Sequence, residues 1–203
     1  MDSQKLAKMA IRKGAVQKNK ELSALISLLK KRKLNTVVEV GTARGGTFYA
    51  WCKIAKPNAI VVSIDLPGGP FGGGYTINEM KRFKKYGKKN QKLYFIRKNS
   101  QLVKTKNELV KVLGGEKIDF LMIDGDHGYK GVKKDWELYS PLVKENGIVV
   151  FHDIVFHSKV PKCQVERLWE KIKKLHKHKE FIDPGDIRTW GPWAGIGVIY
   201  YKP

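Results

Sequence analysis

The stretch that most constrains the fold of this chain is TVVEVGTARGGT, residues Thr36–Thr47, in which a short apolar run leads directly into a glycine-rich turn. Glycine lacks a Cβ atom, so the backbone at such a turn adopts positive φ and approaches a ligand closely. The helix that we expect to begin near Gly46 would offer free N–H groups to a carboxylate. A strand–turn–helix unit of this kind predicts an α/β protein with a ligand bound at the turn.

The residues of this turn disfavour an NAD-dependent enzyme. A dinucleotide fingerprint requires G-x-G-x-x-G, which brings the pyrophosphate onto the start of the helix. Here Glu39 occupies the first glycine position, and Ala43 interrupts the pattern. A carboxylate is unfavourable beside pyrophosphate but favourable beside an ammonium group, so the turn favours a cationic ligand over a dinucleotide.

Apolar runs alternate with amphipathic segments along the chain, and the central runs are nearly continuous. This pattern predicts a Rossmann-like, doubly wound α/β fold whose seven-stranded sheet is mostly parallel and covered by helices on both faces. A loop rather than a helix separates the last two strands, which predicts an antiparallel hairpin at one edge. Residues 1–203 are expected to form a single domain, with 1–33 as a helical N-terminal extension. We expect strands at 36–40, 60–64, 93–96, 118–123, 147–151, 180–182 and 195–201, and helices at 21–31, 46–55, 77–88, 102–113, 129–142 and 164–177.

Composition excludes several classes of protein. No run of about 18 apolar residues is present, and the N-terminus lacks the apolar core of a secretory signal, so we expect a cytoplasmic protein without a membrane span. Cys52 and Cys163 lie far apart and form no metal-binding spacing; reduced thiols are the simplest interpretation, with a disulfide left open. The net charge of +21 suggests a nucleic-acid partner, but 33 of the 40 basic residues are lysine, which fits a solvated surface or compositional bias better.

Polar residues directly follow each of the first five predicted strands. Ligands of open α/β sheets bind at the carboxyl ends of the strands, so these side chains are expected to share one rim. A single polar residue at such a place has little meaning, but five strand ends together are hard to explain by packing. They are Glu39 with the glycine turn, Asp65, Asn99-Ser100, Asp124-Gly125-Asp126-His127 and His152-Asp153.

The segment IDGDH and the pair His152-Asp153 carry the predicted chemistry. Asp124, His152 and Asp153 offer hard oxygen and nitrogen ligands that suit Mg, Mn or a similar divalent metal, although the two aspartates would also serve as helix caps. A metal there would orient a substrate hydroxyl and lower its pKa. His127 is the candidate general base, because an unperturbed imidazole titrates near neutral pH. Whether a metal is bound stays open at this point.

The series E-x-G-x-x-x-G-G, D-G-D-H-x-Y-x-G-V-x-x-D and H-D, over about residues 35–155, resembles the small-domain S-adenosylmethionine (SAM)-dependent methyltransferases of class I that are related to cephalosporin hydroxylase and to macrolide and rhamnosyl O-methyltransferases. The resemblance implies a class I fold, SAM as cofactor, often a divalent metal, and O-methylation of a sugar or phenol-like hydroxyl. In metal-dependent relatives two acids, or an acid and an amide, usually follow the fifth strand, whereas here His152 takes the first place.

The resemblance also implies roles for individual residues. The turn would wrap the amino-acid end of SAM, Asp65 would accept hydrogen bonds from its ribose, and Asn99 and Ser100 would lie near its adenine, although all three also fit ordinary turn or cap positions. Asp124 would contribute to catalysis as well as to the cofactor site. The full set of expected cofactor-binding residues is Glu39, Gly41, Thr42, Ala43, Gly45, Gly46, Asp65, Asn99, Ser100, Asp124 and Gly125.

We therefore expect an O-methyltransferase acting on a small molecule or a sugar. An RNA methyltransferase that uses the basic surface, and a non-catalytic nucleotide- or sugar-binding module, stay as alternatives. Two loops are expected to cover the pocket, Pro67–Thr76 and Asp183–Ala194, the second of which carries Arg188, Trp190 and Trp193 for contact with a substrate or for packing. The acceptor and the oligomeric state, including a homo-oligomer, are left open.

Overall fold

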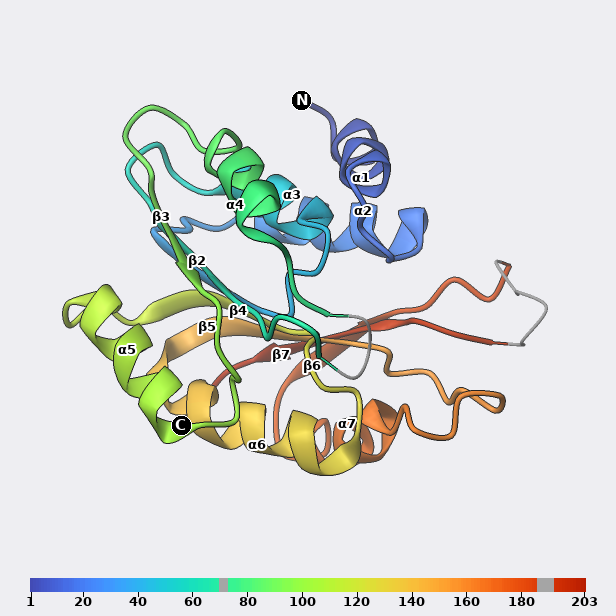
Figure 1. The fold of residues 1–203 in the computed structure, drawn as a ribbon. Coiled ribbons are helices and arrows are strands. Elements are labelled where there is room, and N and C mark those ends of the chain that lie inside the picture. The colour runs from blue at the N-terminus through green and yellow to red at the C-terminus, as the bar shows by residue number, and fades with distance from the viewer. Residues whose placement is uncertain (70–72, 186–191) are drawn as a thin grey trace.

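The computed structural model describes residues 1–69, 73–185 and 192–203. In these ranges seven strands form one sheet in the order β3-β2-β1-β4-β5-β7-β6, with helices on both faces (Figure 1). The strands are β1 (Thr36–Val40), β2 (Ile60–Ile64), β3 (Lys92–Ile96), β4 (Ile118–Ile123), β5 (Val143–His152), β6 (His178–Phe181) and β7 (Ile196–Tyr200). The helices are α1 (Ser3–Arg12), α2 (Asn19–Leu29), α3 (Gly46–Ile54), α4 (Ile77–Lys84), α5 (Val103–Leu113), α6 (Tyr129–Tyr139) and α7 (Val165–Ile172).

The sheet confirms the predicted fold class. β1 pairs in parallel with β2 and β4, and β5 continues the parallel order beyond β4. β7 is inserted between β5 and β6 and pairs antiparallel with both, which makes the expected edge hairpin. Helices α1 to α4 cover one face, and α5 to α7 cover the other (Figure 1). Every residue of β1 and β4 is buried, as nearly continuous apolar runs in a parallel sheet require.

Several element boundaries differ from the sequence-based expectation, and those of β5, α4, α6 and α7 differ by three residues or more. Helix α4, expected over 77–88, ends at Lys84. β5 begins at Val143 rather than Gly147, because the exposed polar residues 144–146 extend the strand without an apolar pattern. The helix predicted over 129–142 ends at Tyr139, and Pro141 lies in a separate 3-10 turn. Helix α7 ends at Ile172 rather than Lys177, because its apolar face ends there and Leu175 is 79% exposed.

The N-terminal extension packs against the core and is not a loose arm. Leu6 and Ala10 of α1 are buried, and α1 and α2 pack on each other and on α3. A Cβ atom at Gly46 would lie 2.1 Å from the backbone nitrogen of Ala15, so this glycine allows the extension to approach the start of α3. None of the helices in the described ranges has the length and apolar character needed to cross a membrane.

Candidate active site

A cavity of about 620 Å³ opens at the carboxyl ends of β1, β2, β4 and β5. Its walls include the residues that follow these strands, and also the segment 14–17 from the N-terminal extension. Because the parallel strands all end at this edge, side chains far apart in the sequence meet there. The predicted site residues that line the cavity are Gly41, Thr42, Ala43, Asp65, Asn99, Ser100, Asp124, Gly125, His127, His152 and Asp153.

The glycine turn and Asp65 form one hydrogen-bonded unit. Oδ2 of Asp65 accepts from the backbone N–H groups of Thr42 at 2.8 Å and of Ala43 at 2.6 Å. Burial raises the pKa of Asp65, and these two N–H groups oppose that effect. Gly41 has a φ of +87°, and a Cβ atom there would lie 1.9 Å from the carbonyl oxygen of Asp124. The turn therefore requires glycine where the end of β1 contacts the end of β4.

Glu39, Gly45 and Gly46 were predicted to bind the cofactor, but they do not line the cavity. The Glu39 carboxylate is fully buried beneath the turn, where it accepts hydrogen bonds from the Thr42 hydroxyl and the Trp51 indole, each at 2.7 Å. Burial raises the pKa of Glu39 to about 7. In this arrangement Glu39 supports the turn from behind, and a direct role in ligand binding stays a prediction.

Two aspartates and two histidines alternate in a second part of the cavity wall, next to the turn. Nδ1 of His152 lies 3.3 Å from Oδ1 of Asp124 and 3.4 Å from Oδ2 of Asp153. His127 closes the ring, with Nε2 at 3.4 Å from Asp124 Oδ1 and Nδ1 at 3.1 Å from Asp153 Oδ2. The structure thus brings together the predicted base and the three predicted metal ligands, which come from the ends of β4 and β5.

The charges in this ring stabilise one another. Burial works against the charged form of His127, but hydrogen bonds with Asp124 and Cys163 and the charge of Asp153 raise its pKa to about 10. Burial likewise opposes the charge on Asp153, yet the charge of His152 holds the pKa of Asp153 well below its usual value. With no other cation present, His127 therefore carries its proton at neutral pH.

The side chains around Asn99 and Asp126 fix loops at the rim. The Asn99 side chain accepts from the backbone N–H of Gln101 at 2.8 Å, which is the cap geometry that the sequence also allowed. Asp126 accepts from Gln101 Nε2 at 2.7 Å and from the backbone N–H of Gly128 at 2.8 Å, at the start of α6.

Behind Gly125, Asp135 is fully buried, and this burial raises its pKa to about 7.

Several residues of the cavity were not predicted from the sequence. Gln17 donates its side-chain amide to Asp124 Oδ2 at 2.8 Å, across 107 positions of sequence. His157 lies with Nε2 at 3.2 Å from Asp153 Oδ1, and Cys163 completes this part of the wall. None of these residues directly follows a central strand, so the pattern of polar strand ends did not indicate them.

The N-terminal extension also holds the second predicted loop at its two ends. The Glu21 carboxylate accepts from the backbone N–H of Asp183 at 2.8 Å and from that of Gly195 at 3.0 Å. Nζ of Lys18 donates to the Asp183 carbonyl at 2.7 Å and lies over the Trp193 ring. Trp193 is thereby held at the cavity. The two other predicted loop residues, Arg188 and Trp190, lie outside the described residues, as do positions 70–72 of the first loop.

Comparisons with known proteins agree with this architecture. A model of a methyltransferase domain family matches residues 38–154. An uncharacterized protein of Sinorhizobium fredii, y4gI, is 26% identical over 132 residues, which are 64% of this chain and 14% of that protein. The chain thus spans only a small part of the length of this relative.

Solved structures share the fold at low sequence identity. An O-methyltransferase from Bacillus cereus in complex with SAH has a TM-score of 0.63 at 12% identity, over 98% of this chain and 90% of that one. The N-methyltransferase NodS from Bradyrhizobium japonicum has a TM-score of 0.63 at 10% identity, with 89% and 94% covered. An rRNA methylase from Streptococcus thermophilus has a TM-score of 0.60 at 12% identity, with 93% and 100% covered.

Proposed function

The chain belongs to this methyltransferase domain family, and from that membership we propose that it transfers the methyl group of SAM to a hydroxyl group of a small molecule or a sugar. The observation that carries the proposal is the composition of one cavity. The glycine turn with Asp65 lines one part of this cavity, and the ring of His127, Asp124, His152 and Asp153 lines another. A cofactor and an acceptor would therefore meet in one cavity.

The turn and its neighbours fit the proposed cofactor. A volume of about 620 Å³ lies within the range of roughly 300–1,000 Å³ that ligand sites occupy. Gly41 allows the turn to lie directly against the end of β4, and Asp65 lines the cavity with a carboxylate that suits ribose hydroxyls. Asn99 and Ser100 lie on the rim where adenine would follow the ribose. SAM would supply an electrophilic methyl group on a sulfonium centre.

His127 is the proposed general base. It would accept the proton of the acceptor hydroxyl as that oxygen attacks the methyl group, and Asp124 and Asp153 would hold its ring in orientation from both sides. The charge of these carboxylates keeps the proton on the free imidazole, so His127 would become available as a base when a cation shares that charge and the imidazole proton leaves to solvent. Positioning of the hydroxyl in line with the methyl group would supply most of the acceleration.

A divalent cation fits the same ring. Its ligands would be Asp124, His152 and Asp153, whose facing oxygen and nitrogen atoms are 3.3 and 3.4 Å apart. Such an ion would withdraw carboxylate charge from His127 and lower the pKa of an acceptor hydroxyl. Val16, Val160 and Trp193 add apolar surface to the cavity lining, which the apolar part of an acceptor would contact.

Calorimetric titration of SAM into the purified chain tests the cofactor. We expect micromolar binding by the wild type and a loss of at least tenfold in Asp65→Asn, whereas the exposed control Glu145→Gln should bind like the wild type. Absence of SAM binding by the folded wild type would sink the proposal. Equal binding by the wild type and Asp65→Asn would remove only the assignment of Asp65.

The acceptor is tested by transfer of a radiolabelled methyl group from SAM to sugars and phenols and, in a parallel arm, to RNA. RNA is the second candidate because the net charge is +21 and an rRNA methylase shares the fold. We expect label on a small hydroxylated molecule, with a rate that changes little with salt. Label on RNA that falls steeply as salt rises would replace the small-molecule acceptor by nucleic acid.

A further inference from the structure

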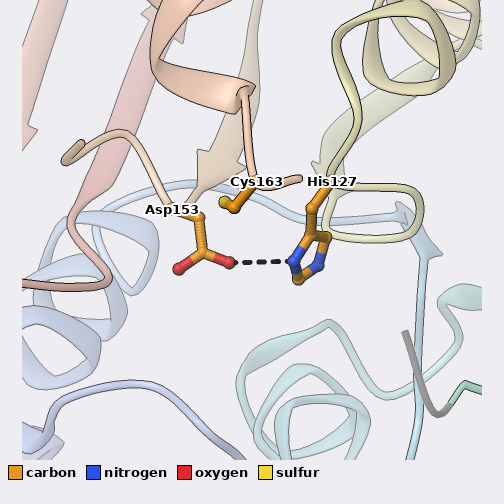
Figure 2. A group of neighbouring side chains, drawn as sticks. All are labelled: His127, Asp153 and Cys163. Carbon is orange, nitrogen blue, oxygen red and sulfur yellow. Dashed lines mark ion pairs between the residues drawn. The ribbon is translucent and has the colours of Figure 1, made fainter. Parts of the chain in front are cut away.

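A second group of possible metal ligands overlaps the ring of acids and histidines. His127, Asp153 and Cys163 each offer one donor atom, and these atoms all lie within 4.8 Å of one another. Figure 2 shows the Asp153 carboxylate and the His127 imidazole facing each other, with the Cys163 side chain close beside Asp153. Nδ1 of His127 lies 3.1 Å from Oδ2 of Asp153. The group therefore combines nitrogen, oxygen and sulfur donors at one wall of the cavity.

The backbone fixes Cys163 beside His127. The N–H of Gln164, the next residue, donates to the carbonyl oxygen of His127 at 2.7 Å, and the N–H of Cys163 donates to the Val160 carbonyl at 2.8 Å. These bonds join the turn before α6 to the turn before α7, so the two side chains meet through a defined backbone contact. Cys163 is 4% exposed and lines the cavity.

Asp153 is also oriented toward this group. Its Oδ1 atom lies 3.2 Å from Nε2 of His157, which leaves Oδ2 to face His127. A carboxylate ligand that is held by a further side chain is common in metal sites, because the outer contact fixes the direction of the ligand. His157 and Asp153 are both buried, so solvent does not compete for this contact.

The donor types select the class of ion. Mg and Ca prefer oxygen ligands, whereas a thiolate together with an imidazole favours zinc and similar borderline ions. Zinc binds sulfur at about 2.3 Å and nitrogen or oxygen at about 2.0–2.2 Å, and three protein ligands with one open position are typical of its reactive sites. Three donors that lie this close together, on the wall of a cavity, match that pattern.

We propose that His127, Asp153 and Cys163 form a site for a zinc-class ion, with its remaining coordination position facing the cavity. The site differs from the harder set of Asp124, His152 and Asp153, from which it takes only Asp153. Its consequence for activity rests on the proposed function, since an ion on His127 occupies a base of the methyl transfer, and the loaded chain would then be inactive. The binding of the ion itself depends on neither SAM nor an acceptor.

Cobalt(II) titration into the reduced full-length chain tests the site, because a thiolate bound to cobalt absorbs in the near ultraviolet. We expect one equivalent of cobalt per chain, a thiolate-to-cobalt charge-transfer band, and displacement of that band by zinc but not by magnesium. Cys163→Ser should lose the band and bind cobalt more than tenfold more weakly. The matched control is Cys52→Ser, since Cys52 is buried in α3 away from the cavity and should leave the band unchanged.

The wild type alone can overturn the proposal, so the test does not depend on how the variants fold. Bound cobalt without a thiolate band would show that Cys163 is not a ligand and would leave only the harder set. No cobalt binding at all would remove the site, as would a band that disappears in Cys52→Ser but persists in Cys163→Ser. Parallel titration of SAM keeps this result separate from the proposed function, because each ligand is measured without the other.

Discussion

Two parts of the cavity wall are built in different ways. The turn wall, residues 41–43 with Asp65, comes from one continuous motif and one neighbouring strand end, and two short backbone contacts hold it together. The imidazole wall, which consists of Asp124, His127, His152, Asp153, His157 and Cys163, is assembled from the ends of two strands and the segment before α7. A further tie reaches this wall from Gln17 in the N-terminal extension.

The two walls are therefore stabilised by different interactions. Backbone geometry shapes the turn wall, so glycine substitutions should disturb it most. Opposite charges hold the imidazole wall, because each acid lies between imidazoles within 3.4 Å. A mutation can therefore change the backbone shape of the turn wall without changing the charges of the imidazole wall, and the reverse also holds. We expect the effects to decrease from substitutions in the turn to substitutions at the edge of the imidazole wall.

The largest effect is expected where the two walls touch. Gly41→Ala would place a Cβ atom 1.9 Å from the Asp124 carbonyl oxygen, so it should lower the free energy of unfolding by roughly 3–5 kcal/mol and abolish SAM binding. The matched control is Gly114→Ala, which also has positive φ but no atom within 4 Å, and should cost only about 1–2 kcal/mol. Urea unfolding of both variants measures the difference, and equal losses would contradict the steric argument.

Removal of the proposed base should act on turnover and leave the turn wall intact. His127→Gln is expected to lower kcat by about 10²–10⁴-fold, because a positioned base typically contributes that much. SAM affinity should stay within a few-fold of the wild type, since the turn and Asp65 bind the cofactor. Radiolabelled methyl transfer measures kcat, and calorimetry measures SAM affinity. If the variant loses SAM affinity as strongly as turnover, His127 is needed for cofactor binding as well, and the two walls do not act separately.

The contribution of Glu39, which lies beneath the turn, to the free energy of unfolding should depend on pH. Burial raises the pKa of Glu39 from 4.5 to about 7, so the folded state holds this proton more tightly than the unfolded state. The contribution to stability is fully present below pH 4.5 and is lost as pH rises toward 7, by roughly 3 kcal/mol. Glu39→Gln removes this contribution, so its unfolding free energy should fall less than that of the wild type across this range.

Urea unfolding between pH 4 and 8 measures this pH dependence. Asp135 has a similarly raised pKa and is present in both proteins, so the difference between wild type and variant isolates Glu39. Parallel pH profiles would mean that the Glu39 carboxylate is not desolvated as the structure indicates. The amide oxygen of glutamine can accept from the Trp51 indole, and its NH2 group can donate to the Thr42 hydroxyl oxygen with the direction of that bond reversed, which makes the substitution a conservative one.

The smallest effect is expected for the tie from the N-terminal extension. Gln17→Ala removes one hydrogen bond to Asp124, so it should lower kcat/KM about tenfold and leave SAM affinity unchanged. The exposed residue Gln4 provides the control, and Gln4→Ala should have no effect on either quantity. Similar results for the two variants would show that the imidazole wall does not need this contact.

The parts of the fold that were predicted correctly are those that short stretches of sequence specify. β1, β2 and β4 have the predicted bounds, because each is an apolar run that ends at a polar residue on the rim. The first four residues of β5 were missed, since residues 144–146 are polar and exposed and the register of β5 with β4 is interrupted between Val143 and Ile148. The C-terminal end of α7 was misplaced because lysine-rich segments carry little information about where a helix stops.

The predicted site shows the same division. Asp124, His127, His152 and Asp153 were identified as strand-end residues, and the structure brings them into contact. Gln17, His157 and Cys163 carry no such pattern, so they could be found only after the chain was folded. The family resemblance also implied a direct ligand contact for Glu39; the structure places its carboxylate beneath the turn, and the ligand contact stays a prediction.

The sequence alone determined the α/β class, the parallel sheet, the glycine turn and the rim of strand-end acids and histidines. These features depend on hydrophobic periodicity and on backbone conformations that act over a few residues. The tertiary structure decided which side chains meet, including the contact of Gln17 with Asp124, the ends of the loop held by Glu21, and the position of Cys163 beside His127. Such contacts join segments far apart in the chain, and their geometry follows only from the packing of the whole sheet and its helices.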